Sequence, residues 1–205
     1  MADEIAQFKQ LQAEMNAAFD SLIQSSQDGS NNAGAIAAAK QKLGAISQVT
    51  LGTVLGPAFS VMGFTLQPQA YAAVRIAIDL NVFEIVDKPT ELDELAQKTG
   101  ADPIILQRIL RAISSIGYLK QTAITTWEPS TITQALKIPG LRDWTIAHFD
   151  ERLSICGKFP EWLKNRGYRT TGSADDNVFT EVLGSPVEVW YENHPKASII
   201  FDSAM

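Results

Sequence analysis

His148 and Asp150 are the side chains whose types and spacing could do acid–base chemistry. Histidine titrates near neutral pH, and a carboxylate in an apolar pocket can have its pKa raised towards that range. Two residues apart on a helix, the pair would point about 200° from each other, so both cannot face one ligand. Either residue could act on a bound molecule, and a surface or helix-capping role stays open for each.

Other chemical groups give weaker patterns. Cys156 is the single cysteine and has no evident base partner, so we expect a small buried thiol. No cluster has metal-ligand spacing, which predicts no metal site. The runs Leu51–Gly56 and Leu183–Ser185 contain glycine but do not follow a strand that leads into a nucleotide-binding unit. The sequence therefore predicts no cofactor, and we expect no binding of S-adenosylmethionine.

The composition favours a globular protein of the cytoplasm that binds a small molecule or a protein. Hydrophobic residues make up 45% of the 205 residues, enough for a core. The formal net charge of -6 disfavours nucleic acid as a partner. A single cysteine cannot form an internal disulfide, and the first residues, MADEIAQFKQ, do not have the pattern of a secretion signal.

No charged residue occurs between Lys42 and Arg75. Pro57 and several glycines interrupt this run, which makes it a poor membrane-spanning helix, so membrane insertion is not expected. A segment this apolar would otherwise stay exposed, and we expect it to be buried in a homodimer together with an amphipathic helix over residues 5–23.

Residues 67–137 have the order of a winged helix, three helices followed by a small β-hairpin. Asp102 and Pro103 are typical of a helix start, and Gly100 and Gly117 of helix ends. The face of the third helix is predicted to carry Ile105, Ile109, Ile113 and Ile116.

Two capping boxes are predicted, Thr90 with Asp93 and Thr131 with Gln134. The chain is expected to be helical again after residue 131. The fold class is therefore mainly α, an intertwined helical dimerisation domain with a winged-helix-like element and a small β-hairpin. The expected domains are a helical dimerisation segment (1–66), a winged-helix-like subdomain (67–137) and a helical acceptor-pocket segment (138–205).

Several stretches in register resemble the fungal type of S-adenosylmethionine-dependent O-methyltransferases. These stretches are LQPQAYAAVRIAIDLNVFEIV, TELDELAQKTGADPIILQRILRAISSIGYLKQ, FPEWLKNRGYR and VFTEVLGSPVEVWYENHPKASIIFDSAM. The resemblance implies that this half intertwines with its copy and forms one wall of the acceptor pocket. It also implies that the Rossmann half, with the cofactor loop and a histidine base, would follow Met205.

The resemblance further suggests which residues bind substrate in addition to His148 and Asp150. They are Phe149, Leu153, Phe159, Trp162, Phe179, Leu183, Pro186, Trp190 and Met205. Aromatic rings offer a large apolar wall for a planar or polycyclic ligand. The alternative, that the large apolar members are simply core, remains open.

Three functions follow from this resemblance. The first is a protein of secondary metabolism that does not methylate but binds an apolar polyketide-like or terpenoid intermediate and steers its cyclisation or rearrangement, which would make it a cofactor-independent cyclase or isomerase. The second is a non-catalytic partner that dimerises with itself or with a full-length methyltransferase relative. The third is an N-terminal fragment of an ordinary methyltransferase.

Overall fold

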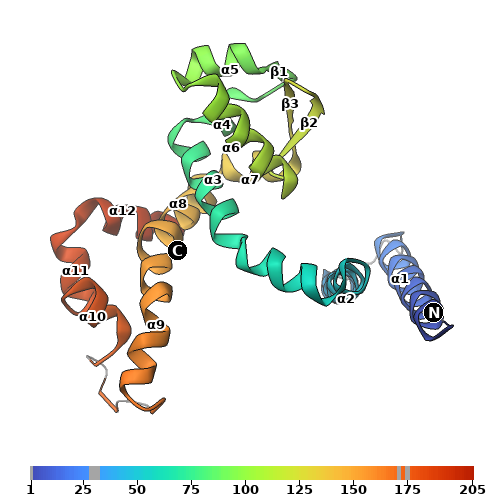
Figure 1. Ribbon diagram of the computed structural model, residues 1–205, viewed down its shortest axis with the longest axis horizontal. Coiled ribbons are helices and arrows are strands. Elements are labelled where there is room, and N and C mark those ends of the chain that lie inside the picture. The colour runs from blue at the N-terminus through green and yellow to red at the C-terminus, as the bar shows by residue number, and fades with distance from the viewer. Residues whose placement is uncertain (1, 28–32, 170–171, 174–175) are drawn as a thin grey trace. The chain divides into compact units, whose positions relative to one another are not determined.

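The computed structural model describes residues 2–27, 33–169, 172–173 and 176–205. The chain divides into two compact units, residues 1–66 and 67–205. Figure 1 labels the helices and strands of both units.

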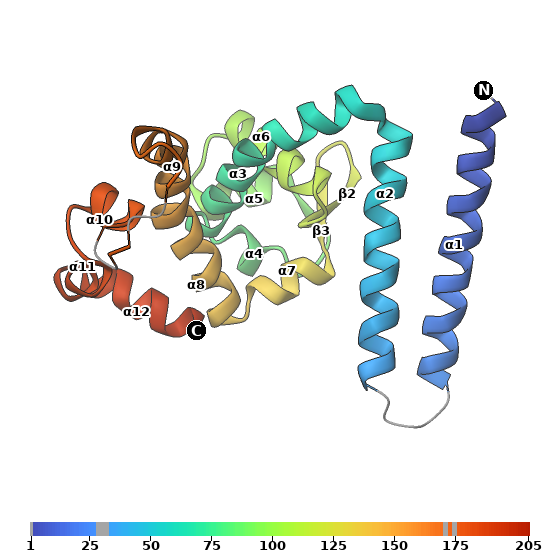
Figure 2. The ribbon, with the colours of Figure 1, turned by 90° about the horizontal axis from the view of Figure 1, so that it is seen from below.

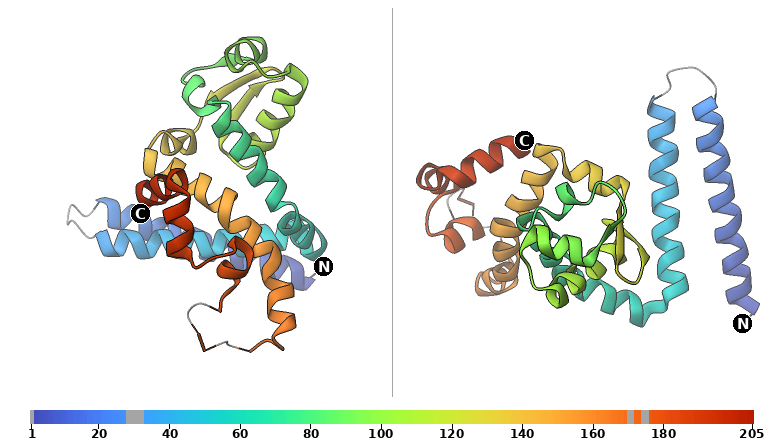
Figure 3. Two further views of the ribbon diagram at one scale, coloured as in Figure 1. Left: turned by 90° about the vertical axis from the view of Figure 1, so that its left-hand side faces the viewer. Right: turned by 90° about the horizontal axis from the view of Figure 1, so that it is seen from above.

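The first unit is a pair of long helices, α1 (Ala2–Gln27) and α2 (Ala33–Thr65). They lie side by side (Figure 2, Figure 3), and their seam buries Leu11 and Ala18 of α1 and Ala39 and Ile46 of α2. The helix predicted to follow residue 34 runs on through the uncharged stretch, but it is kinked at Gly56, whose φ is 76°. Pro57 disfavours helical backbone at the residue before it, and a glycine adopts a positive φ without a Cβ clash.

The second half of α2 is apolar and exposed. Its exposed large side chains are Val49, Leu51, Val54, Leu55, Phe59, Val61, Met62 and Phe64. Among the described residues, α2 is also the one helix long and apolar enough to cross a membrane by length and composition.

The second unit begins with the winged-helix element. Its helices are α3 (Gln67–Asp79), the short α4 (Val82–Ile85), α5 (Leu92–Thr99) and α6 (Pro103–Ser115). Its strands are β1 (Thr90–Glu91), β2 (Leu119–Ala123) and β3 (Thr126–Pro129). The predicted hairpin is β2–β3, and β1 joins it to form an antiparallel sheet of order β1-β3-β2. The predicted fold class, mainly α with a winged-helix-like element, is confirmed.

Local signals explain most of this element. The carboxylate of Asp102 accepts hydrogen bonds from the backbone N–H groups of Ile104 (2.9 Å) and Ile105 (3.1 Å), as a helix N-cap does. Gly100 ends α5 with a φ of 70°. Both predicted helix boundaries are therefore confirmed.

The predicted face of α6 is partly wrong. Its buried residues are Leu106, Ile109, Leu110 and Ile113, whereas Ile105 and Ile116 are exposed. A helix turns 100° per residue, so the four-residue steps from Ile105 to Ile113 drift by about 80° around the axis. The face of α6 that packs into the core is therefore the one that contains Leu106 and Leu110.

Both predicted capping boxes are wrong. Thr90 pairs with Trp127 in the sheet, which requires an extended backbone, and Glu91 is the N-cap residue of α5. The next helix, α7 (Thr131–Leu136), is capped by Ser130, whose hydroxyl accepts from the N–H of Thr133 at 3.2 Å. The Thr133 hydroxyl in return accepts from the N–H of Ser130 at 2.8 Å.

The rest of the unit is helical. In chain order it contains α8 (Pro139–Ala147), the π-helical turn η1 (His148–Arg152), α9 (Leu153–Asn165), α10 (Val178–Leu183), α11 (Val187–Asn193) and α12 (Pro195–Ala204). Helix α12 packs along α8 (Figure 2). The turn η1 joins α8 to α9, and π-helical turns of this kind occur frequently at functional sites.

Candidate functional site

His148, at the start of η1, is held by the residue one turn before it. Its Nδ1 lies 2.9 Å from the carbonyl oxygen of Trp144, and the centres of the two rings lie 4.0 Å apart at an interplanar angle of 31°. A carbonyl only accepts hydrogen bonds, so Nδ1 carries the proton and Nε2 carries the lone pair of the neutral ring. Nε2 makes no hydrogen bond within the described residues. The ring is therefore oriented to accept or return a proton at Nε2.

His148 lines a hollow of about 370 Å³ between α8, η1 and α12, which we call the Trp144 hollow. Its lining residues are Trp144, Ala147, His148, Arg152, Phe201, Ala204 and Met205. The Arg152 guanidinium lies 5.8 Å from the ring centre of Phe201 and 5.4 Å from that of Phe179. Its Nε is buried and has no hydrogen-bond partner among the described residues. The hollow thus combines an aromatic wall, an imidazole and a cation.

Asp150 forms a two-point ion pair with Arg75 of α3, with both N···O distances 2.9 Å. Arg75 also pairs with Asp79, one turn along α3. The hydrogen bonds that Arg75 donates to Asp150 are the largest cause that raises the pKa of Arg75. The ion pair of Asp150 with Arg75 therefore links η1 to α3.

Tyr71 of α3 makes two further contacts, one with α8 and one with η1. Its hydroxyl donates to the carbonyl oxygen of Thr145 at 2.8 Å, and its ring meets that of Phe149 edge-on at 5.3 Å. Burial is the main cause that raises the pKa of Tyr71 from about 10 to about 12.

The raised pKa of Tyr71 predicts a loss of stability in alkali. Because the folded-state pKa lies above the unfolded one, the neutral phenol's contribution is complete below pH 10 and disappears as the pH rises to about 12. We expect Tyr71→Phe to show a smaller fall in melting temperature across this range than the wild type. Tyr168→Phe, which changes an exposed tyrosine, is the control. Equal falls in wild type and Tyr71→Phe would contradict the prediction.

A second hollow, of about 330 Å³, shares the lining residue Ala147 with the first, and we call it the Glu151 hollow. Its lining residues are Ile146, Ala147, Asp150, Glu151, Leu183, Trp190, Lys196, Ala197 and Ile200. Glu151 is only 5% exposed, and its Oε2 accepts a hydrogen bond from the Tyr191 hydroxyl at 2.7 Å. Burial and this hydrogen bond raise the pKa of Tyr191.

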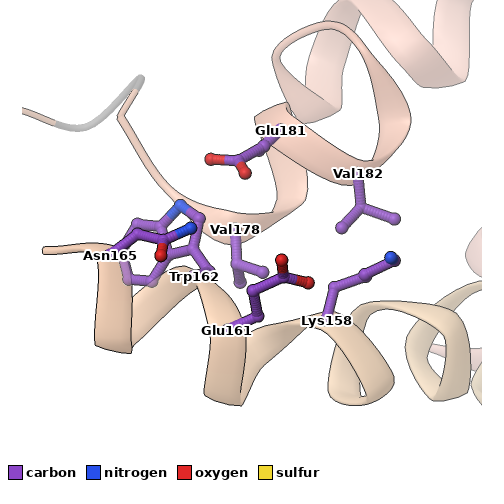
Figure 4. Close-up of a pocket in the computed structure, with 7 residues that line it drawn as sticks. All are labelled: Lys158, Glu161, Trp162, Asn165, Val178, Glu181 and Val182. Carbon is purple, nitrogen blue, oxygen red and sulfur yellow. The ribbon is translucent and has the colours of Figure 1, made fainter.

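A third hollow, of about 360 Å³, lies between α9 and α10. Figure 4 shows Trp162 and Asn165 at one end and Lys158 and Val182 at the other, with the carboxylates of Glu161 and Glu181 extending from the two helices. Trp162 is buried against Phe159, at 5.9 Å between ring centres, and under the guanidinium of Arg166, at 4.3 Å.

Six of the eleven predicted site residues are distributed over these three hollows. His148 and Met205 line the Trp144 hollow, Asp150, Leu183 and Trp190 line the Glu151 hollow, and Trp162 lines the third. Five line none of the three: Phe149, Leu153, Phe159, Phe179 and Pro186. Substrate binding by any of these residues stays a prediction. Cys156, predicted to be buried, is exposed on α9.

Sequence analysis missed Glu151, Tyr191 and Arg152, as well as Trp144. A signal for Trp144 was present, because Trp144 and His148 are four residues apart on a predicted helix and therefore adjacent. Trp190 and His194 repeat this spacing, with ring centres 4.2 Å apart. The partnership of Glu151 with Tyr191 joins residues 40 apart, and no local pattern indicates it.

Comparison with known proteins places the winged-helix element in a family. Residues 68–135 match the model of the O-methyltransferase dimerisation domain. This chain carries an O-methyltransferase dimerisation domain. The match covers most of the winged-helix element and the start of α7.

Fungal O-methyltransferases are among the relatives of this chain. Demethylsterigmatocystin 6-O-methyltransferase of Aspergillus flavus is 31% identical over 141 residues, which cover 66% of this chain and 36% of that protein. The solved structure of LepI with SAM superposes on 94% of this chain with a TM-score of 0.77 at 24% identity. A structure described as a pericyclic reaction enzyme has a TM-score of 0.72 at 26% identity. The chain spans about a third of the length of its curated relatives and half of each of these two solved chains.

Proposed function

We propose that this chain belongs to an O-methyltransferase-like enzyme of secondary metabolism that steers a cyclisation or rearrangement. In this proposal the Trp144 hollow holds an apolar multi-ring or polyene-derived intermediate. The observation that carries the proposal is the meeting of an aromatic wall, the oriented imidazole of His148 and the shielded cation of Arg152 in one hollow. The similarity to a pericyclic reaction enzyme supports it.

The reaction class suits a site of this composition. A cyclisation or rearrangement is an isomerisation, so the product keeps all atoms of the substrate and needs no methyl donor. Holding a flexible molecule in a reactive shape can supply on the order of 7 kcal/mol of the barrier. His148 would exchange or share a proton, and Arg152 would stabilise negative charge that develops on the substrate. Of the two acid–base candidates we assign proton transfer to His148 and a positioning role to Asp150, whose carboxylate is bound by Arg75.

The test is to incubate the chain with candidate polyene and polyketide intermediates and measure product ratio and rate. We expect a changed product ratio relative to buffer, with the same yield whether or not S-adenosylmethionine is added. A rate and product ratio equal to those in buffer would refute the cyclase proposal.

A second function, dimerisation, is favoured by the apolar surface of α2. Its exposed side chains form a surface that a dimerisation domain can bury against a copy of the chain or against a full-length methyltransferase relative. This function does not depend on catalysis and could accompany it.

The dimer can be tested through α2. We expect light scattering at micromolar concentration to give the mass of two chains, and Val54→Lys with Phe59→Lys to give the mass of one, because each lysine would bury a charge in an apolar interface. Gln41→Lys, at an exposed polar position of α2, is the control and should remain dimeric. A monomeric wild type would exclude this interface.

A further inference from the structure

Glu151 is a buried carboxylate without a cationic partner among the described residues. Glu151 is only 5% exposed, yet no lysine, arginine or histidine of the described residues forms an ion pair with it. Neighbouring Arg152 directs its guanidinium at the rings of Phe179 and Phe201 instead. Carboxylates are rarely buried this deeply unless they are paired, because the loss of hydration is costly.

One oxygen of Glu151 remains available. Oε2 accepts from the Tyr191 hydroxyl at 2.7 Å, whereas Oε1 makes no hydrogen bond within the described residues. Unlike the unpartnered nitrogens Arg152 Nε and Trp162 Nε1, Oε1 is not completely buried. The free oxygen therefore reaches accessible space, and Glu151 lines a hollow of about 330 Å³.

The rest of that hollow is mostly apolar. Six of its nine lining residues are apolar: Ile146, Ala147, Leu183, Trp190, Ala197 and Ile200. The two other charged residues are exposed, and of these Asp150 is already bound by Arg75. A ligand that enters thus meets apolar side chains, one buried carboxylate with a free acceptor oxygen and, at exposed positions, the charged side chains of Asp150 and Lys196.

We propose that the Glu151 hollow is a binding site for a small apolar molecule that carries a protonated amine. The ammonium group would donate to Oε1 and supply the positive charge that the buried carboxylate lacks, while the hydrocarbon part would contact Leu183, Trp190 and Ile200. The Tyr191 hydroxyl orients the carboxylate by holding Oε2. This site is separate from the Trp144 hollow and does not depend on its proposed chemistry.

The test uses benzylamine, which is protonated at pH 7, and benzyl alcohol, a neutral probe of nearly the same shape. Titration followed by tryptophan fluorescence, with calorimetry on the full chain, should show benzylamine binding at least tenfold more tightly than benzyl alcohol. This comparison needs no variant. Equal affinities for the two probes would overturn the proposal.

Substitutions then locate the site. We expect Glu151→Gln, which keeps the shape and removes the charge, to weaken benzylamine at least tenfold and leave benzyl alcohol unchanged. Glu192→Gln makes the same change at an exposed position of α11 and should bind both probes as the wild type does. His148→Gln should also leave benzylamine binding unchanged, which separates this site from the Trp144 hollow. Wild-type benzylamine affinity in Glu151→Gln would place the amine elsewhere and refute the proposal.

Discussion

His148→Gln is expected to slow the proposed cyclisation or rearrangement by about a hundredfold, the lower end of what general acid–base groups contribute. Glutamine can still donate to the Trp144 carbonyl oxygen, which the imidazole now does at 2.9 Å. An amide neither gains nor loses a proton near neutral pH, and it carries no positive charge. The variant should therefore keep the local structure and lose the chemistry. The measurement is the single-turnover rate of product formation, together with the melting temperature.

His194→Gln is a closely matched control. Its imidazole repeats the arrangement of His148, with Nδ1 2.7 Å from the Trp190 carbonyl oxygen and the ring stacked on Trp190. His194 is exposed and lines neither the Trp144 hollow nor the Glu151 hollow. We expect its variant to react at the wild-type rate. If both variants lose activity equally, or if His148→Gln loses none, the assigned role of His148 is wrong.

The winged-helix element was predictable because its determinants are local. Asp102 caps a helix through N–H groups two and three residues away, and Gly100 and Gly117 end helices through their own backbone conformation, with φ values of 70° and 83°. Such signals depend on a few neighbouring residues and do not depend on how the rest of the chain packs. The third strand was missed because Thr90 is extended only through its pairing with Trp127, far along the chain.

The candidate site was predicted less completely for the same reason. The residues of the Glu151 hollow come from α8, η1, α10, α11 and α12, and only packing brings these helices together. The Arg75–Asp150 ion pair joins residues 75 apart, so no spacing rule relates them. Aromatic residues were assigned to one pocket by resemblance, whereas Phe149 packs on Tyr71 and Phe159 on Trp162. Residue type alone does not distinguish a ring in a wall from a ring in the core.

Leu110→Ala is expected to lower the free energy of unfolding of the second unit by about 2 to 5 kcal/mol. Leu110 is fully buried in the core that α6 shares with α3, α5 and the sheet. Alanine would remove three methyl or methine carbons from this core and leave a cavity that the surrounding helices fill only in part. Urea unfolding followed by circular dichroism should show a lower midpoint with little change in slope, because the area exposed on unfolding is nearly the same.

Ile105→Ala on the same helix is the control for Leu110→Ala. Ile105 is 51% exposed, so its truncation should change the free energy of unfolding by less than about 0.5 kcal/mol. The comparison also decides between two faces of α6, since the isoleucine spacing predicts that Ile105 faces the core and the structure places Leu106 and Leu110 there. A loss at Ile105 as large as the loss at Leu110 would mean that α6 is rotated about its axis relative to this packing. A loss of stability at Leu110 alone would support the packing in which Leu106 and Leu110 face the core. Helix α3 packs against α6 in that core, and its Tyr71 and Arg75 make the contacts that position η1.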